Sequence, residues 1–328
     1  MPIFDLPPIH IPFPSRINPH QDEAVRASNA WLESMGLLNH EARRSLESGR
    51  FFELASRAYP EVQAPELEWM INLIRWIFLL DDALDQGALR NRVGEAETLL
   101  ARLFSLFSAD QGVPPATPGL EQAGVALVAA IGSALSPQGQ RRFIADIRAY
   151  FDAVLKEIEA RASGEPLDLL AFAEVRRYTG ATHLLFSAGE SAQHAELPDA
   201  FCRSWPFQIL QDSASDVVVL VNDIFSYGKE SHYDEINNYV VVCQHHLGLS
   251  LQAAMVFVND LSSARLQAFE QARARLPLFI ERQQYPHTQR AAIERYIDML
   301  ESWMSGNLAW SLQVPRYNDV HARPGANR

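Results

Sequence analysis

Two short segments of the chain concentrate side chains whose oxygen atoms could hold a divalent cation. Asp81, Asp82 and Asp85 form the sequence DDALD directly after the mostly apolar residues 71–80. The four-residue offset between Asp81 and Asp85 places both carboxylates on one face of a helix. Carboxylates this close repel one another without a cation, and Mg²⁺ prefers oxygen ligands and often shares them with substrate phosphates. A solvated acidic helix end is the alternative.

The second segment, VNDIFSYGKE, follows the apolar residues 217–221. Asn222, Ser226 and Glu230 are spaced by four residues, and with Lys229 they share one helical face within about a quarter turn. An amide, a hydroxyl and a carboxylate can ligate Mg²⁺ with little excess negative charge, which leaves the ion able to accept phosphate oxygens. Lys229 adds a cation beside them. The alternative is an ordinary polar stripe on an amphipathic helix.

The elements that carry these segments are predicted to be helices, and the fold class to be all-α. From Asp22 onward apolar residues recur at three- and four-residue spacing, as at Ile71, Ile74 and Phe78, and period-two alternation is scarce. Helices are therefore expected over residues 22–35, 40–58, 65–87, 94–107, 120–135, 137–162, 168–195, 205–230, 236–247, 250–283 and 287–311.

The distribution of proline and glycine suggests how the chain is organised. Residues 1–20 contain six of the 19 prolines. Because proline lacks the amide donor that a helix interior needs, these residues are predicted to form an extended arm. Residues 109–119 are predicted to form a surface loop, since no repeat or linker divides the remainder. One catalytic helical domain is expected over residues 21–317, with a tail at residues 318–328.

The bulk composition excludes several classes of protein. The 328 residues are 48% hydrophobic and 21% charged, which is ordinary globular composition. A net charge of -12 argues against a broad basic surface for nucleic acid or anionic lipid. Cys202 and Cys243 suggest neither a disulfide framework nor a thiolate zinc site. With no targeting segment and no apolar run of roughly 20 residues, we expect a cytoplasmic monomer or homodimer without stable membrane insertion.

The two segments, in this order, resemble the metal-binding motifs of class I terpene synthases over roughly residues 20–317. NDIFSYGKE resembles the NSE motif, NDxxSxxKE, and DDALD resembles the aspartate-rich motif. The resemblance implies a helical bundle that encloses a central apolar active-site cavity. It implies that Asn222, Ser226 and Glu230 hold one Mg²⁺, and that Asp81, with Asp85 as a further candidate, supports two more. Three ions are thus expected with diphosphate bound, with Mn²⁺ as a substitute.

Further positions match the same family. Its diphosphate-sensing arginine stands 46 positions before the NSE asparagine, and here that residue is Arg176. Thr179 and Gly180 then fall at the linker and effector positions of its helix break, although the linker is often Asp. Arg316-Tyr317 resembles the pair that contacts diphosphate when the site closes. Taken singly, Arg176 could be a surface cation and Arg316 a basic tail residue.

The resemblance implies a reaction in which a linear prenyl diphosphate loses its diphosphate and leaves a carbocation. Mg²⁺, Arg176, Lys229, Arg316 and Tyr317 would stabilise the charge that develops on the leaving oxygens. The size and motif style resemble fungal and bacterial sesquiterpene synthases, so farnesyl diphosphate is the favoured substrate. Geranyl diphosphate and a linear alcohol product remain open.

The carbocation needs shelter from water and aromatic faces to support it. Phe78 stands one helical turn before Asp81, and Trp310 stands six residues before Arg316, as a cavity tryptophan often does in similar enzymes. These two are the favoured aromatic residues. The weaker candidates, for which core packing is the simpler role, are Phe52, Tyr59, Phe151, Phe186 and Trp303. The proline-rich arm is expected either to cover the cavity mouth or to be a passive tether.

Two other functions fit parts of the pattern. A prenyl-chain elongating enzyme also uses Mg²⁺ and allylic diphosphates, but it generally carries two DDxxD motifs, and here Asn222, Ser226 and Glu230 replace the second. An inactive helical binding protein is the alternative from another class, which two intact sets of metal ligands disfavour.

Overall fold

A computed structural model describes residues 4–85, 87, 89–109 and 112–318 of the chain. Every regular element in this part is helical, and no strand occurs among the described residues, as the all-α prediction required. The α-helices are α1 Gln21–Ser34, α2 His40–Gly49, α3 Phe51–Ala58, α4 Ala64–Asp85, α5 Val93–Phe107, α6 Leu120–Ser133, α7 Pro137–Ser163, α8 Leu169–Thr179, α9 Thr182–Ala192, α10 Asp199–Cys202, α11 Trp205–Glu230, α12 Tyr239–Leu247, α13 Leu251–Gln283, α14 His287–Ser311 and α15 Pro315–Asn318. A short 3₁₀ turn, η1 Ser231–Tyr233, follows α11.

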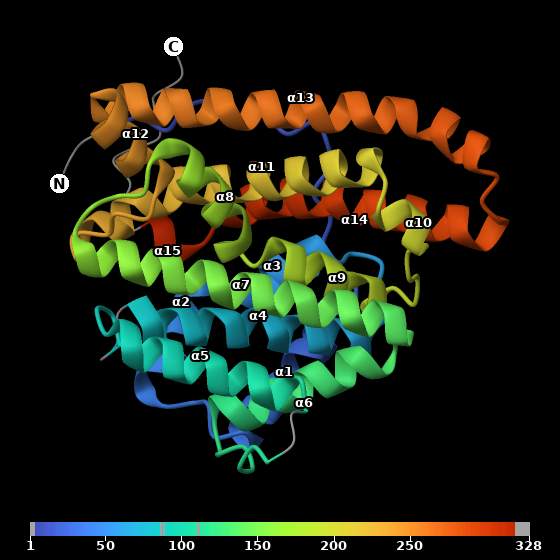
Figure 1. Ribbon diagram of the computed structural model, residues 1–328, viewed down its shortest axis with the longest axis horizontal. Helices are drawn as coiled ribbons and strands as arrows, with labels where there is room; N and C mark the ends of the chain where they lie inside the picture. The colour runs from blue at the N-terminus through green and yellow to red at the C-terminus, as the bar shows by residue number, and fades with distance from the viewer. Residues whose placement is uncertain (1–3, 86, 88, 110–111, 319–328) are drawn as a thin grey trace.

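The helices that carry the two motifs lie in the interior of the bundle (Figure 1). α11 packs against α13 on one side and α14 on another, and α4 packs against α1, α3, α6 and α9. Residues 213–221 of α11 are all buried, and most of residues 67–80 of α4 are buried too. A helix that is apolar all round is stable only inside the protein. The motifs therefore follow core segments whose positions are fixed by packing.

Two helices predicted as continuous are broken in the structure. The predicted helix 40–58 divides into α2 and α3 at Arg50, which adopts a left-handed conformation with φ 42°. Gly49 permits this turn because a Cβ there would collide with the ring of Phe51. The periodicity of apolar residues continues through the break, so the pattern alone did not reveal it.

The predicted helix 168–195 ends at Thr179, and α9 begins at Thr182 after Ala181, whose φ is 54°. Gly180 at this break lies so close to α11 that a Cβ would collide with Cγ1 of Val219. The break is where the family resemblance, but not the periodicity, placed an interruption.

Residues 4–20 form no helix and run along α13 toward α3. Phe4 is buried with its ring 5.7 Å from that of Tyr227, and Gln252 of α13 hydrogen-bonds the backbone of Asp5 at both N and O. At the other end the Asn18 amide donates to the carbonyls of Tyr59 and Val62. These contacts attach the arm to the bundle along its length.

None of the helices in the described ranges is long and apolar enough to cross a membrane alone. α12 and α13, which meet at a bend of 116°, pass a length and composition test only as a pair.

Candidate active site

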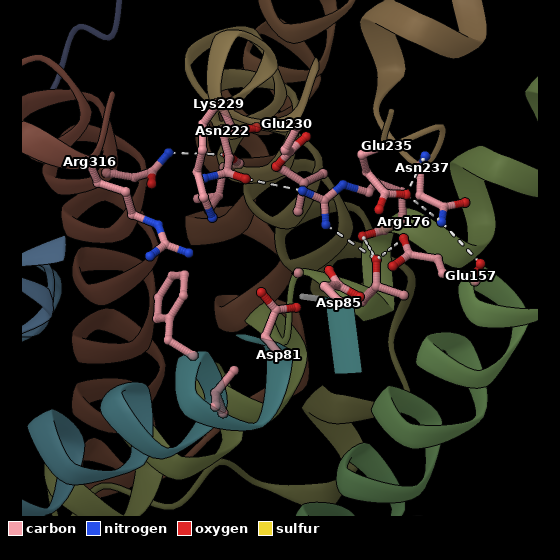
Figure 2. Close-up of a pocket in the computed structure, with 18 of the residues that line it drawn as sticks. Asp81, Asp85, Glu157, Arg176, Asn222, Lys229, Glu230, Glu235, Asn237 and Arg316 are labelled. Atoms are coloured by element: carbon pink, nitrogen blue, oxygen red, sulfur yellow. Dashed lines mark hydrogen bonds between the residues drawn. The ribbon is translucent and has the colours of Figure 1, made fainter. Parts of the chain in front are cut away.

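Both motifs face one cavity inside the bundle (Figure 2). Its mouth is polar, with side chains from α4, α7, α8, α11 and α15, and its depth is apolar. The apolar lining comprises Leu54, Ile74, Ile77, Phe78, Leu185, Val218, Val219, Trp303 and Trp310. A charged rim over an apolar interior can hold the head group of an amphiphilic substrate at one end and its chain at the other.

Asp81 and Asp85 lie on the last turns of α4 and line the mouth of the cavity. Burial raises the pKa of Asp81 well above its ordinary value, and the charges of Asp85 and Asp82 raise it further. Asp85 accepts a hydrogen bond of 2.7 Å from Arg161 of α7. The ionised form of Asp81 is therefore disfavoured without a cation, and a bound cation would stabilise it.

Asp82, the middle carboxylate of DDALD, is engaged differently. It accepts hydrogen bonds from the Ser45 hydroxyl and, at 3.2 Å, from the Arg316 guanidinium. Three carboxylates were considered as one cluster from the sequence, but only Asp81 and Asp85 line the cavity.

Asn222, Ser226 and Glu230 of α11 lie along one face and line the same mouth. Asn238, in the segment after η1, donates from its amide to Glu230 at 2.9 Å. The Asn222 carbonyl oxygen accepts from Arg176 at 3.1 Å, while its NH₂ group donates to the Tyr317 hydroxyl at 2.9 Å. These contacts fix the orientation of the oxygen atoms that face the cavity.

Arg176 of α8 is held by a fully buried carboxylate. Its Nε and one terminal nitrogen donate to Oδ1 of Asp223 at 3.0 and 2.6 Å, and another nitrogen donates to the Thr179 hydroxyl at 3.3 Å. Burial alone would lower the pKa of Arg176, but Asp223 and Glu157 raise it above the ordinary value. Arg176 is thus a permanent cation at the mouth. Asp223, adjacent to Asn222 in the motif, is the partner that was not singled out from the sequence.

The other cations of the mouth are Lys229 and Arg316. Burial lowers the pKa of Lys229, and the neighbouring charge of Arg316 lowers it further. The guanidinium carbon of Arg316 lies 5.4 Å from the ring of Phe51 and 5.5 Å from that of Phe78. These two cations lie near each other at the mouth, and an anionic ligand would relieve the repulsion between them.

Several residues of the site were not predicted from the sequence, because they lie outside the two motifs and their helices. Glu157 and Arg161 of α7 are four residues apart on one helical face, and this spacing was the available signal. Glu235 accepts from Arg161 Nε at 2.7 Å. The remaining lining residues of this group are Arg90, Tyr150, Tyr233 and Asn237. Their convergence arises from tertiary packing alone.

The aromatic candidates separate into two groups. Phe78, Trp303 and Trp310 line the cavity, whereas Phe52, Tyr59, Phe151 and Phe186 are not among its lining residues. Tyr59 and Phe186 are buried in the core. The favoured pair, Phe78 and Trp310, lie with ring centroids 6.4 Å apart on opposite helices.

The raised pKa of Glu157 predicts how the thermal stability of the protein depends on pH. Burial raises its pKa from 4.5 to about 8, opposed by Arg176 and by the hydrogen bond from Thr179. The unfolded chain binds fewer protons between these values, so the contribution of Glu157 to stability is full below pH 4.5 and is lost as pH rises through about 8. In EDTA, we expect Tm to fall more steeply for the wild type than for Glu157→Gln from about pH 5 to about pH 8. Parallel curves would contradict this assignment.

The close approach of α8 and α11 gives a second test. In Gly180→Ala the added methyl group would displace Val219, and overpacking of this kind costs about 1–3 kcal/mol. We expect that loss in urea unfolding, together with reduced catalytic turnover. Gly94→Ala is the matched control, because a Cβ at Gly94 in α5 meets no atom within 4 Å. A Gly180→Ala variant as stable as Gly94→Ala would show that the break tolerates a side chain.

The donor atoms suit a hard divalent cation that is shared with a ligand. Among the residues that the structure describes, no three His, Cys, Asp or Glu side chains gather closely enough to hold a metal ion by themselves. The mouth instead offers Asp81 and Asp85 from α4 and a mixed oxygen set from α11. Mg²⁺ in phosphate-handling sites is commonly bound by one or two carboxylates plus phosphate oxygens. The residues present fit that mode.

Comparisons with known proteins identify the family that the chain resembles. Residues 72–268 match the family model described as terpene synthase family 2, C-terminal metal binding. Pristinol synthase from Streptomyces pristinaespiralis is 31% identical over 95% of this chain and 85% of its own length. The (-)-beta-caryophyllene synthase of Saccharothrix espanaensis, named as (2E,6E)-farnesyl diphosphate cyclizing, is 31% identical over 97% of this chain and 90% of its own. The crystal structure of germacradien-4-ol synthase from Streptomyces citricolor superposes with a TM-score of 0.83 at 26% identity, covering 94% and 99% of the chains.

Proposed function

Since this chain belongs to the class I terpene synthases, we propose that it converts farnesyl diphosphate into a sesquiterpene, with Mg²⁺ as its cofactor. The observation that carries this proposal is the convergence of Asp81 and Asp85 with Asn222, Ser226 and Glu230 over one apolar cavity. Relatives that span nearly the whole chain include an enzyme named for cyclizing farnesyl diphosphate. Residues 21–317 are proposed as the catalytic domain.

We assign the metal ligands to the two faces of the mouth. Asp81, with Asp85, would hold ions on the α4 side, and Asn222, Ser226 and Glu230 would hold one on the α11 side. When bound, Mg²⁺ supplies Lewis-acid stabilisation of the charge on diphosphate oxygens.

The side chains of the mouth bind and orient the diphosphate. Arg176, Lys229 and Arg316 supply positive charge, and the Tyr317 hydroxyl supplies a hydrogen-bond donor. Arg176 is held in place by Asp223, and Arg316 by Asp82, so neither cation must be ordered at the moment of reaction. This preorganisation favours loss of diphosphate, because the charge develops where the donors already point.

The apolar depth of the cavity receives the prenyl chain and the carbocation. Phe78, Trp303 and Trp310 present aromatic rings, whose negative faces attract a cation by about 0.5–2 kcal/mol each. Apolar side chains around them keep bulk water from the cation. Cyclisation then depends on how these surfaces fold the chain.

The test is product analysis by gas chromatography with mass spectrometry. Purified protein with Mg²⁺ would be given farnesyl, geranyl or geranylgeranyl diphosphate, each with and without isopentenyl diphosphate. We expect a C15 product from farnesyl diphosphate alone, with the highest kcat/KM of the three, and none in EDTA. No product from any substrate would contradict the proposal, and a product that requires isopentenyl diphosphate would indicate chain elongation.

A further inference from the structure

Asn307 of α14 is a polar side chain in the apolar part of the cavity. It is 2% exposed and lines the cavity. Its NH₂ group donates to the backbone carbonyl of Val218 on α11 at 3.1 Å. Because an amide NH₂ only donates and its oxygen only accepts, this bond fixes which way the amide points. The oxygen Oδ1 accepts no hydrogen bond from any residue that the structure describes.

The position of Asn307 is below the diphosphate end of the cavity. Val218 precedes Asn222 by one helical turn on α11, a rise of about 6 Å. On α14, Trp303 and Trp310 stand four residues before and three after Asn307, so all three share one face and all line the cavity. The amide oxygen therefore lies among the side chains that would surround the carbocation, not among those that would bind diphosphate.

The backbone of Gly180 lies near the same part of α11. Gly180, at the break between α8 and α9, lines the cavity and borders Val219, the neighbour of Val218. An unpaired acceptor such as Oδ1 of Asn307 is unfavourable in an apolar enclosure unless a donor reaches it. A prenyl chain has no hydrogen-bond donor, whereas a water molecule has two.

We propose that Asn307 is a catalytic residue that holds a water molecule against the carbocation, so that the enzyme releases a sesquiterpene alcohol. The inference rests on the proposed function and specifies its product class. The water donates one hydrogen to Asn307 Oδ1 and turns a lone pair toward the cationic carbon. The oxygen forms a bond to that carbon, one O–H bond breaks, and the proton passes to the diphosphate released in the first step. No electrons are gained or lost overall.

The experiment measures the origin of the product oxygen and its dependence on Asn307. Wild-type protein is incubated with farnesyl diphosphate and Mg²⁺ in H₂¹⁸O, and products are analysed by mass spectrometry. We expect a major alcohol that carries ¹⁸O from the solvent. In Asn307→Leu, which keeps a similar volume, the ratio of alcohol to hydrocarbon should fall at least ten-fold, while diphosphate release falls less. Asn307→Gln, which keeps an amide oxygen, should restore part of the alcohol.

Ser305→Ala is the matched control. Ser305 is a buried polar residue of α14, two positions before Asn307, and it is not among the residues that line the cavity. Removing its hydroxyl should leave the alcohol share unchanged. Hydrocarbon products without ¹⁸O from the wild type, or an unchanged alcohol share in Asn307→Leu, would overturn the assignment while leaving terpene synthase activity intact. Absence of any turnover would instead refute the proposed function.

Discussion

Asp81→Ala should abolish turnover of farnesyl diphosphate, with kcat/KM at least about 10³-fold lower, a loss of about 4 kcal/mol of transition-state stabilisation. Asp81 lines the mouth of the cavity, and the negative charges of Asp82 and Asp85 add to the effect of burial in raising its pKa. On the α4 side, this carboxylate would be the principal ligand of the proposed metal ions. Steady-state kinetics with saturating Mg²⁺ measures the effect.

The same substitution should leave the metal-free fold intact or more stable. A carboxyl group with a raised folded-state pKa contributes stability at low pH and loses it as pH rises through that pKa. Near neutral pH in EDTA, Asp81→Ala should therefore have a Tm at least equal to that of the wild type, with unchanged helicity. Glu68→Ala, on the same helix but outside the cavity, should retain activity. Full activity in Asp81→Ala would exclude Asp81 as a metal ligand.

Arg176→Lys should lower kcat by about 10²-fold or more, although the positive charge is kept. The guanidinium of Arg176 contacts Asp223, Asn222 and Thr179 at once, which a lysine ammonium cannot reproduce. A lysine ammonium at this position would bind the leaving diphosphate less tightly and would leave the buried Asp223 carboxylate without the two hydrogen bonds that Arg176 donates. Binding of inorganic diphosphate in Mg²⁺, measured by calorimetry, should weaken in parallel with kcat.

The neighbouring residue provides a close control for that experiment. Arg177 pairs with Asp216 at 2.8 and 3.0 Å and is not among the residues that line the cavity. Arg177→Lys should keep activity and diphosphate affinity near the wild-type values. Equal losses in the two variants would mean that the effect reflects general disturbance of α8 and not a specific contact with the substrate.

The C-terminal segment joins the two sides of the mouth. Arg316 contacts Asp82 of α4, and Tyr317 contacts Asn222 of α11. Adjacent residues of α15 therefore bind both motif-bearing helices at once. Diphosphate bound to Arg316 or Tyr317 would compete with these contacts to Asp82 and Asn222.

The sequence revealed the part of the site that is encoded locally. Asn222, Ser226 and Glu230 could be grouped because helical spacing alone places them on one face. The all-α fold followed from apolar periodicity in the same way. The pairing of Arg176 with Asp223 and of Arg161 with Asp85 joins different helices, so no local pattern contains it. The family resemblance supplied Arg176 and Arg316, and the assigned roles of all these residues stay predictions.

The two helix breaks show a second limit of local patterns. Apolar spacing continues across Arg50 and across Ala181, although both residues are left-handed. At Gly180 the determining contact is with Val219, which lies on another helix. Asn307 shows the same limit for function. Its sequence neighbours suggest an ordinary core helix, and only the bond to Val218 reveals which atom of its amide remains unpaired.

The most direct test of the account is a crystal structure with Mn²⁺ and inorganic diphosphate, in which anomalous scattering locates the metal ions. We predict metal peaks bound by Asp81 on one side and by Asn222, Ser226 and Glu230 on the other, with diphosphate between them and in contact with Arg176. Metal and diphosphate bound elsewhere, or diphosphate bound without metal at either motif, would contradict the central claim that α4 and α11 form one metal-dependent diphosphate site.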